Sequence, residues 1–461
     1  MTRVLLVSTY EQGHQPLGLA APAAYLRARG HDVRCLDMAV QQPDADRLRD
    51  VDLIAISVPM HTAARLAMAL ARRLRQLVAA PIAFYGLYAS ELDEQLRSSG
   101  LADAVFGGEY EIGLGHLADA VANGEPVDAL AGSGSLPLFP RQDYLLPDRA
   151  GLPALDEYAR FDPGDGELRL AGYVEATRGC AHRCTHCPLT PTYGGRLRLV
   201  QPEVVLADID QLVALGAQHI TFGDPDFLNA AGHAEQITAE LHARHPDLSF
   251  DATIKVEHLL RRESLLAPLK DRGLAFVTSA FESVDDALLE RLEKGHTRAE
   301  METVMDDARR HGVPLRPTWL PFTPWTAARD FLDILAFVAD HELIDHVQPV
   351  QYALRLLLPP GSPLIAQAEA DGALTGFDAD GLTHTWAHPD PAMDELQRSL
   401  ATYTSQAAAA CDHEDDFLST GQQFDSIRAT AVDALGGSGP SGSGVVRVSR
   451  GVPGLTEDWF C

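Results

Sequence analysis

Short apolar segments and helical segments alternate from residue 3 to about residue 122, and this alternation restricts the fold more than any other feature. Parallel strands need a crossover connection, usually a helix, whereas antiparallel strands can be joined by a tight turn. Five strands with crossover helices predict an open parallel, flavodoxin-like sheet with helices on both faces. The strands are expected at 3–8, 31–36, 53–58, 82–86 and 104–106, and the helices at 17–29, 61–77 and a shorter segment from residue 90.

The alternation returns in the second half of the chain, where six strands and the helices between them predict a partial (β/α)6 barrel of the TIM type. A proline at position 268 is expected to end one of these helices. Functional residues are expected at the carboxyl ends of the strands, where the active sites of such barrels lie. The strands are expected at 173–177, 219–223, 248–255, 274–282, 314–322 and 347–358, and the helices at 202–215, 231–244, 259–267, 285–292, 299–310 and 327–340.

The changes in pattern predict four parts of the chain. The parallel sheet occupies residues 1–125, and a connecting strap rich in Pro, Gly and Asp occupies 126–170. The barrel occupies 171–365, and a helical and then flexible C-terminal extension occupies 366–461. Within the extension, the Gly- and Ser-rich segment 436–444 is expected to be a flexible linker.

Cys180, Cys184 and Cys187 form a C-x-x-x-C-x-x-C triplet directly after the first predicted strand of the barrel. An iron–sulfur cube takes four ligands, so three thiolates leave one iron open to a small molecule. A structural zinc site needs a fourth ligand, which His182 or His186 inside the loop could supply. Zinc-binding C-x-x-C pairs usually repeat at a larger separation, and only one such pair is present. The triplet therefore favours a catalytic iron–sulfur site over structural zinc.

The composition argues against several partners. The chain has 65 acidic and 37 basic residues and a formal charge of -28, which disfavours binding to a phosphate backbone. The N-terminus enters a strand without the features of a signal peptide, and no apolar run is long enough to span a bilayer. Six cysteines, three of them in one cluster, indicate a reducing compartment. We expect a cytoplasmic protein without a nucleic-acid or membrane partner.

The cysteine triplet, with Arg178-Gly179 before it and Pro188 after it, resembles that of the radical S-adenosylmethionine superfamily. The resemblance implies a [4Fe-4S] cluster whose fourth iron is chelated by the amino and carboxylate groups of S-adenosylmethionine. An electron from the cluster then breaks a carbon–sulfur bond of the sulfonium. His186 stands where the superfamily usually has an aromatic residue, and an imidazole can still cover the adenine face.

The resemblance also implies residues that bind S-adenosylmethionine after the second and third barrel strands. The segment 223–227 stands where the superfamily has a Gly-Gly-Glu-like segment that holds the methionyl amino group. Backbone carbonyls of Gly223 and the carboxylates of Asp224 and Asp226 suit an ammonium group, although either aspartate could instead cap a helix. Lys255, at the end of the third strand, is expected to reach a carboxylate.

The fourth and fifth barrel strands supply further candidates. The fourth ends at Ser279 to Ser283, where Glu282 resembles the residue that hydrogen-bonds the ribose hydroxyls, and Ser279 is expected beside it. Trp319 and Trp325 flank a proline-rich segment after the fifth strand. Such aromatic residues are usually core residues, but at this edge they could also exclude water from a radical intermediate.

The carboxyl edge of the N-terminal sheet is expected to bind a cofactor as well. No G-x-G-x-x-G follows its first strand, which disfavours a dinucleotide. The edge residues, with Ser57, Gly86 and the Gly-Gly-Glu-x-Glu turn at 107–111, resemble the cobalamin-binding domain that precedes many radical S-adenosylmethionine cores. Glu11, His14 and Gly18 do not have the D-x-H-x-x-G spacing of a cobalt-ligating histidine. His14 is thus a ligand in an unusual loop, a substrate contact or a satisfied loop histidine, and cobalamin is an optional cofactor.

The C-terminus suggests a narrower resemblance. The motifs at 9–18, 321–326 and 355–362, with the end Trp459-Phe460-Cys461, look like the radical S-adenosylmethionine proteins with a Cys-Cys-Ala-Glu-Pro or Cys-selenocysteine-Ala-Glu-Pro tail. A selenocysteine codon is also a stop codon, so one hypothesis is that the sequence is truncated after Cys461. The alternative is a true terminus with a lone thiol. Cys411 and His413 could join this thiol in a soft site, or Cys411 is a buried or incidental cysteine.

Two function hypotheses follow. The first is an enzyme that reductively cleaves S-adenosylmethionine and transfers a methyl or related alkyl group, with a flavodoxin- or ferredoxin-type protein as electron donor. Without cobalamin, 5'-deoxyadenosyl or 3-amino-3-carboxypropyl radical chemistry is the expected alternative. The second hypothesis is a non-catalytic iron–sulfur sensor or scaffold. The sequence does not identify the substrate, whether a small molecule or a peptide.

Overall fold

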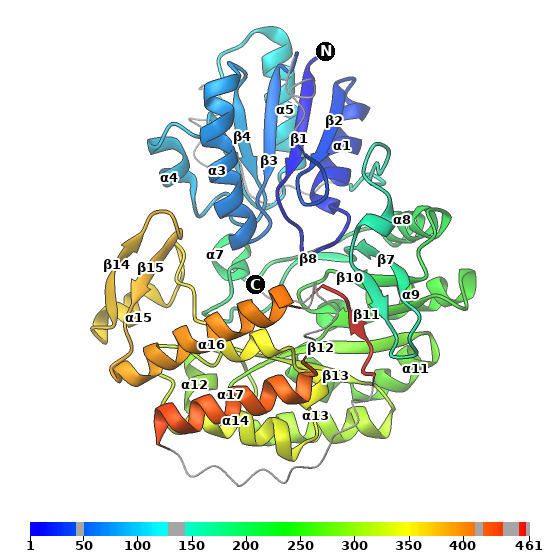
Figure 1. Cartoon of the computed structure of the whole chain (residues 1–461). Helices are drawn as coiled ribbons and strands as arrows, with labels where there is room; N and C mark the ends of the chain where they lie inside the picture. Colours follow the sequence, from blue (N-terminus) through cyan, green and yellow to red (C-terminus); the bar gives the residue numbers. More distant parts are fainter. Residues whose placement is uncertain (43–49, 128–142, 411–417, 437–450, 458–461) are drawn as a thin grey trace.

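A computed structural model describes residues 1–42, 50–127, 143–410, 418–436 and 451–457. Its N-terminal unit is a parallel sheet with the order β2-β1-β3-β4-β5, which is the flavodoxin-like order. The carboxyl ends of these strands face the second unit (Figure 1). The predicted fold of this unit is confirmed. The strands are β1 (Arg3–Ser8), β2 (Asp32–Asp37), β3 (Leu53–Ser57), β4 (Ile82–Tyr85) and β5 (Ala104–Phe106).

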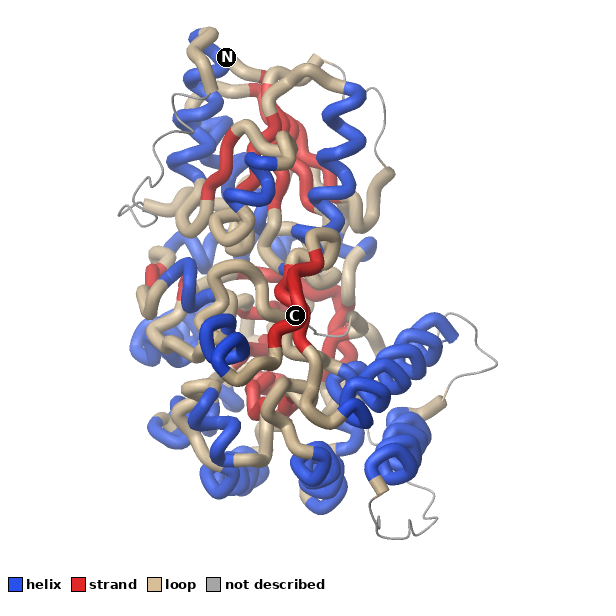
Figure 2. Tube along the Cα trace, turned by 90° about the vertical axis from the view of Figure 1, so that its left-hand side faces the viewer, coloured by secondary structure: helices blue, strands red, loops and turns tan. Residues whose placement is uncertain are grey.

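Helices cover both faces of this sheet (Figure 2). Successive side chains of a strand point to opposite faces, so Leu5 and Val7 belong to a different core from Val4 and Leu6. The first core contains α3 (His61–Leu77) and α4 (Asp93–Ser98), and the second contains α1 (Leu17–Ala28) and α5 (Glu111–Asn123). A sheet buried on both faces leaves its carboxyl edge as the accessible side for a ligand.

The second unit contains a curled sheet of seven strands in the order β13-β12-β11-β10-β7-β6-β16. Five of them pair in parallel and form the half-barrel, while β6 and β16 extend its β7 edge in antiparallel pairing. The strands are β6 (Arg160–Asp162), β7 (Arg169–Val174), β10 (His219–Phe222), β11 (Ser249–Thr253), β12 (Leu274–Glu282), β13 (Leu315–Trp319) and β16 (Gly454–Leu455).

Seven helices accompany the half-barrel, and their termini follow local signals. Asp285 caps α12 by accepting hydrogen bonds from the backbone of Ala287 and Leu288, and Thr297 and Glu300 form a capping box at the start of α13. The helices share one continuous apolar core with the strands. They are α8 (Pro202–Ala214), α9 (Ala231–Arg244), α10 (Val256–Arg261), α11 (Leu266–Asp271), α12 (Asp286–Arg291), α13 (Arg298–Arg310) and α14 (Ala328–Asp340).

Two local predictions in the half-barrel were wrong. The expected sixth strand at 347–358 is a 3-10 helix, η5 (Pro349–Ala353), followed by a single parallel bridge between Phe322 and Arg355. The expected helix at 259–267 is interrupted between α10 and α11, and Pro268 does not end it. Pro268 lies in the first turn of α11. Backbone N–H groups of a first turn have no partner within the helix, so a proline, which lacks this group, is tolerated there.

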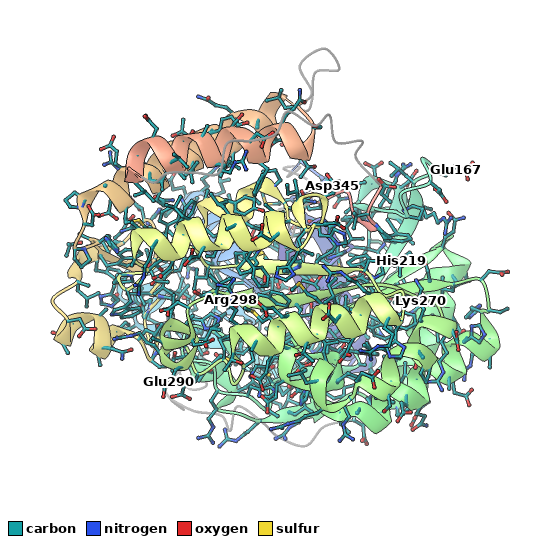
Figure 3. The ribbon with its side chains drawn as sticks, turned by 90° about the horizontal axis from the view of Figure 1, so that it is seen from below. Glu167, His219, Lys270, Glu290, Arg298 and Asp345 are labelled. Atoms are coloured by element: carbon teal, nitrogen blue, oxygen red, sulfur yellow. The ribbon has the colours of Figure 1, made fainter. Side chains whose placement is uncertain are left out.

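One buried polar group lies inside the sheet of the half-barrel. His219 on β10 is fully buried, and its two ring nitrogens lie 2.8 Å from Ser249 Oγ and from Asp251 Oδ1 on the adjacent strand. Figure 3 shows His219 within the molecule, whereas Glu167 and Glu290 lie at its periphery. The ring also stacks on Phe161 of β6 at a centroid distance of 3.8 Å. The pairing of both nitrogens offsets the cost of burying this residue.

The C-terminal extension packs on the half-barrel through two helices. Leu396 of α16 (Pro391–Ala410) and Ile427 of α17 (Thr420–Leu435) belong to the apolar core of the half-barrel. Before them come α15 (Ile365–Ala370) and the hairpin of β14 (Leu374–Asp378) and β15 (Thr383–Trp386). Cys411, His413 and most of the expected linker lie outside the described residues. In the described parts of the chain, no helix combines the length and the apolar character that crossing a membrane requires.

Candidate active site

One cavity of about 510 Å³ lies where the carboxyl edges of the two sheets meet. It is lined by the loops after β1, β3 and β4 of the N-terminal unit and by the strand ends of the half-barrel. Both sheets therefore direct their ligand-binding edges into one space. The expected residues that line it are Cys180, Cys184, Cys187, Gly223, Asp224, Asp226, Lys255, Glu282, His14, Ser57 and Gly86.

Ser279 is the expected site residue that does not line this cavity. On β12, Thr278, Ala280 and Glu282 face the cavity. Because side chains alternate along a strand, Ser279 shares the opposite face with Phe281, and it is fully buried. Ser279 points away from the cavity because it lies between two residues that face it.

The three cysteines lie in the loop between β8 (Thr177–Gly179) and α7 (Leu189–Tyr193). Gly179 has a φ of +75°, and a Cβ there would meet the backbone oxygen of Arg196 at 2.4 Å, so the residue before the triplet has to be glycine. Thr185 anchors the loop to the half-barrel, since its backbone N–H donates to the oxygen of Leu292 at 3.1 Å. The loop is therefore fixed at its start and at its middle.

The thiols of this loop suit a bound cation. Cys184 is buried, and Cys180 and Cys187 are half-buried. Burial raises the pKa of Cys187 to about 12, so a thiolate at that position needs a positive partner, which a cluster iron supplies. Asn229 places its side-chain amide nitrogen 3.3 Å from Sγ of Cys180. The donor set and its burial fit an iron–sulfur cluster.

The two histidines of the loop each lie close to a carboxylate. His186 Nε2 lies 3.1 Å from Oε1 of Glu282, and His182 Nε2 lies 3.3 Å from Oδ2 of Asp226. The alternative in which either histidine completes a zinc site with the cysteines is therefore not favoured by this arrangement. His182 and His186 instead connect the cysteine loop to the ends of β10 and β12.

Glu282, an expected site residue, forms a charged cluster with His186 and Lys294. The sequence did not reveal Lys294 as a member of this cluster. Lys294, which follows α12, places Nζ 3.2 Å from the same Oε1 that His186 contacts. Burial opposes ionisation of Glu282, but the charges of Lys294 and His186 outweigh it and lower its pKa to about 2. Glu282 also has a φ of +65°, which is uncommon for a residue other than glycine and is concentrated at functional sites. No sequence motif distinguished Lys294 from other lysines.

The segment after β10 differs in its details from the expectation. Asp224 accepts hydrogen bonds from Thr177 Oγ1 at 2.5 Å and from the backbone of Ala176 at 3.0 Å, so both of its carboxylate oxygens are engaged. Burial raises the pKa of Asp224 to about 7. A Cβ at Gly223 would lie 1.9 Å from the hydroxyl of Tyr173, which explains the glycine. Asp224 thus uses both carboxylate oxygens within the protein, whereas Asp226 and the backbone of this segment line the cavity.

On the side of the N-terminal unit, His14 packs within the protein. Its ring stacks on Tyr173 of β7 at a centroid distance of 4.7 Å, and burial lowers its pKa to about 4. Nearby, Glu11 Oε1 accepts the backbone N–H of Gly18 at 3.1 Å, and burial raises the pKa of Glu11 to about 8. At neutral pH the His14 ring and the Glu11 carboxyl are therefore uncharged groups at the cavity wall.

The Gly-Gly-Glu-x-Glu turn connects the two units. Arg178, two residues before Cys180, lies 2.6 Å from Glu111 and 3.3 Å from Glu109 of the turn, and 3.0 Å from Glu175. Arg178 and the two turn carboxylates are buried. The expected cobalamin-side motif thus also holds the backbone that leads into the cysteine loop.

Two further segments, the strap and the C-terminal segment with β16, contact both units. In the strap, the buried Arg149 forms a bidentate pair with Asp208 of α8 and donates to Gln15 in the loop after β1. At the C-terminal side, β16 pairs with β6, and Glu457 accepts a hydrogen bond from the hydroxyl of Tyr10 at 2.7 Å. Leu455 and Glu457 line the cavity, whereas residues 458–461 lie outside the described residues.

Comparisons with family models identify both units. Residues 174–331 match the model of the radical SAM superfamily, and residues 3–113 match that of the B12 binding domain. The chain thus contains a B12-binding domain followed by a radical SAM domain, and both predicted resemblances are confirmed. A radical SAM domain implies a [4Fe-4S] cluster and S-adenosylmethionine.

Curated relatives share a part of this sequence. A hopanoid C-3 methylase of Methylococcus capsulatus is 24% identical over 330 residues, which cover 68% of this chain and 62% of the methylase. A ribosomal protein uS12 methylthiotransferase RimO of Desulfotalea psychrophila is 26% identical over 204 residues, 39% of this chain and 42% of the relative. The chain therefore spans less than two thirds of these relatives.

Solved structures match over almost the whole chain. The radical S-adenosylmethionine methyltransferase TsrM from Kitasatospora setae, with tryptophan substrate and a SAM analog bound, gives a TM-score of 0.68 at 15% identity and covers 94% of this chain and 99% of its own. The cobalamin-dependent S-adenosylmethionine radical enzyme OxsB gives 0.70 at 16% identity and covers 94% and 72%. At these identities the likeness establishes the fold, a parallel sheet joined to a half-barrel.

Proposed function

We propose that this chain, a B12-binding domain joined to a radical SAM domain, is an enzyme that transfers a methyl or related alkyl group with cobalamin as a second cofactor. One observation carries the proposal: the cysteine loop and the carboxyl-edge loops of the B12-binding domain line the same cavity. Two cofactors that share one enclosed space can act on one substrate. The names of the relatives, a methylase and a methylthiotransferase, support the same class of reaction.

The residues of the cavity divide into two sets. Cys180, Cys184 and Cys187 would hold three irons of the cluster, and the backbone at 223–226 with Glu282 would hold S-adenosylmethionine. When bound, the cluster and S-adenosylmethionine supply reductive cleavage of the sulfonium, and cobalamin supplies a carrier for the methyl group. Ser57 and Gly86 are at the edge assigned to cobalamin.

The chain itself contributes charge placement and the exclusion of water. Lys294 and His186 keep Glu282 ionised, so its carboxylate is ready to accept hydrogen bonds from hydroxyl groups. Trp319 and Leu356 are buried at the wall of the cavity, and apolar walls keep water away from a reactive intermediate. An electron must also reach the cluster, and we propose a flavodoxin- or ferredoxin-type donor.

A second candidate follows from the loop after β1. His14 stacks on Tyr173, and this contact favours a packing role for the ring over a role as a cobalt ligand. Cobalamin-independent cleavage of S-adenosylmethionine, to a 5'-deoxyadenosyl or 3-amino-3-carboxypropyl radical, remains the competing proposal.

Anaerobic reconstitution tests both candidates. The protein, reduced and supplied with S-adenosylmethionine, is expected to retain cobalamin and to form S-adenosylhomocysteine. Methylthioadenosine or 5'-deoxyadenosine without retained cobalamin would support the second candidate, and no product above background would leave a non-catalytic iron–sulfur protein. Cys184→Ala is expected to remove the cluster absorbance and all products. Cys35→Ala is the matched control, because Cys35 is also a buried free cysteine but belongs to the core of the N-terminal unit.

We also propose the narrower relationship to proteins with a Cys-Cys-Ala-Glu-Pro or Cys-selenocysteine-Ala-Glu-Pro tail. Its support is the pairing of β16 with β6 and the contact between Glu457 and Tyr10, which bring the chain before Cys461 to the cavity. Mass spectrometry of the protein from its native source tests it. A mass that ends at Cys461 without selenium or further residues would contradict this relationship.

A further inference from the structure

Three side chains with metal-ligating atoms converge beside the cysteine loop. His182 lies inside the loop, Asp226 follows β10, and His258 lies on α10. Each residue offers one ligand atom, and these three atoms all lie within 4.8 Å of one another. Asp226 is almost completely buried, with 2% of its side chain exposed. None of the three atoms belongs to the set of thiols assigned to the cluster.

The geometry of these atoms is unlike that of a hydrogen-bonded pair. His258 Nδ1 lies 2.6 Å and His182 Nε2 lies 3.3 Å from Asp226 Oδ2. These separations are short enough for hydrogen bonds, yet each of the three buried atoms is without a hydrogen-bond partner within the described residues. The ring nitrogens therefore do not direct their N–H or lone-pair axes at the oxygen. Leaving three buried polar atoms unsatisfied is costly unless another group joins them.

The carboxylate of Asp226 favours a cation at the point where the three side chains meet. A carboxylate buried as deeply as that of Asp226 needs a positive partner. A carboxylate and two imidazoles form the ligand set of catalytic zinc sites and of non-haem iron sites. Oxygen and nitrogen donors of this kind also differ from the soft thiolates that hold an iron–sulfur cluster.

We propose that His182, Asp226 and His258 bind one divalent transition-metal ion of the zinc type. His182 and Asp226 line the cavity, whereas His258 lies behind them. The open coordination positions of the ion thus face the cavity, where they take water or an oxygen or sulfur atom of a bound molecule. Because His182 lies between Cys180 and Cys184, the ion would also tie the cysteine loop to β10 and α10.

A carboxylate and an ammonium group lie beside the other ring nitrogen of His182. A metal-bound histidine usually donates its second ring N–H to a carboxylate. Glu257 Oε2 lies 3.6 Å from His182 Nδ1, and Lys255 Nζ lies 3.4 Å from the same Glu257 oxygen and 3.1 Å from the ring nitrogen. An ammonium group only donates, so without an ion Lys255 donates to Nδ1. An ion on Nε2 would move the ring proton to Nδ1, and Lys255 would then donate to Glu257 alone.

Zinc binding by the full-length protein with its cluster reconstituted tests the proposal. The protein is incubated with Zn²⁺, separated from free metal by gel filtration and analysed for zinc, iron and sulfide. We expect about one zinc per chain, as for other three-ligand protein sites, and loss of that zinc in His258→Gln. His245→Gln is the matched control, since His245 Nε2 also pairs with an aspartate, Asp210, at 2.7 Å. It should retain the zinc.

X-ray absorption at the zinc edge separates this site from the cysteines. Nitrogen and oxygen ligands lie at about 2.0–2.2 Å from zinc and thiolates at about 2.3 Å. Removal of the supporting carboxylate in Glu257→Gln should weaken zinc binding by about 10- to 100-fold. Unchanged iron, sulfide and circular dichroism in His258→Gln show that the fold is intact. A wild-type protein that retains no zinc, equal zinc in His258→Gln, or a sulfur shell around the zinc would each overturn the proposal.

Discussion

Replacement of Arg178 by methionine should destabilise the protein strongly. The substitution keeps an unbranched apolar side chain and removes the charge that Glu109, Glu111 and Glu175 share. Arg178 has 9% of its side chain exposed, and the Glu109 and Glu111 side chains have 0% and 6%. Removing one partner of a buried pair typically costs about 3–5 kcal/mol, because the other charge stays buried without compensation. We expect a loss of free energy of unfolding in this range.

The loss should also depend on pH, and its sign can be derived. Burial raises the pKa of Glu109 and of Glu175 above the ordinary value of a glutamate. A carboxyl whose pKa is higher in the folded protein stabilises it at low pH, and that contribution is lost as the pH rises through the folded pKa. Without Arg178 both carboxyls become harder to ionise. The penalty of Arg178→Met should therefore be larger at pH 8 than at pH 5, where protonation relieves it.

Urea unfolding at both pH values, followed by circular dichroism, measures this penalty. Arg169→Met is the control, because Arg169 pairs with Asp165 at 2.8 Å while 35% of its side chain is exposed. Exposed ion pairs contribute about 0.2–1 kcal/mol. A penalty for Arg178→Met that equals the control, or one that grows at low pH, would refute the assignment of Arg178 as the buried charge that joins the two domains.

Three further outcomes are expected. Because the pKa of Glu11 is about 8 in the folded protein, the free energy of unfolding should fall as the pH rises towards and through 8. Glu11→Gln should remove this pH-dependent component. Parallel curves of unfolding free energy against pH for the two proteins would contradict this prediction. Gly223→Ala places a methyl group against the Tyr173 hydroxyl and should weaken S-adenosylmethionine binding in equilibrium dialysis, while Gly232→Ala, where a Cβ meets no atom, should not. Phe322→Ala should cost about 3–5 kcal/mol in chemical denaturation, since Phe322 is buried in the core of the half-barrel, and a cost below that of Arg169→Met would refute its place there.

The order of the secondary-structure elements was predictable because it depends on short-range patterns. Apolar segments with helical segments between them marked the five strands of the N-terminal sheet and β10, β11, β12 and β13 of the half-barrel. The strand expected at 173–177 overlaps β7 only at the last two residues of β7. The sixth barrel strand failed because an apolar segment forms a strand only when an adjacent edge pairs with it, and here one bridge from Phe322 to Arg355 is present. Pro268 was misjudged because the effect of a proline depends on its position in the helix.

The cysteine triplet was also readable from the sequence, since its spacing within one loop is a local property. The side chains that pair with the residues around this loop were not readable from the sequence. Arg178 meets Glu109 and Glu111, which are 69 and 67 residues away, and Lys294 meets Glu282 across the turn around α12. No local pattern encodes such pairs, because domain packing brings Arg178 to the two glutamates and the course of the chain around α12 brings Lys294 to Glu282.

The sequence by itself thus determined the two parallel βα units, their order, and a cysteine loop able to hold an open iron–sulfur cluster. These properties follow from periodicity and from ligand spacing over a few residues. Only the tertiary structure decided that both carboxyl edges face one cavity, that Ser279 turns away from it, and that His182, Asp226 and His258 converge beside the loop. The physical reason is that side-chain direction and long-range contact depend on strand register and domain packing, which no single segment of the chain specifies.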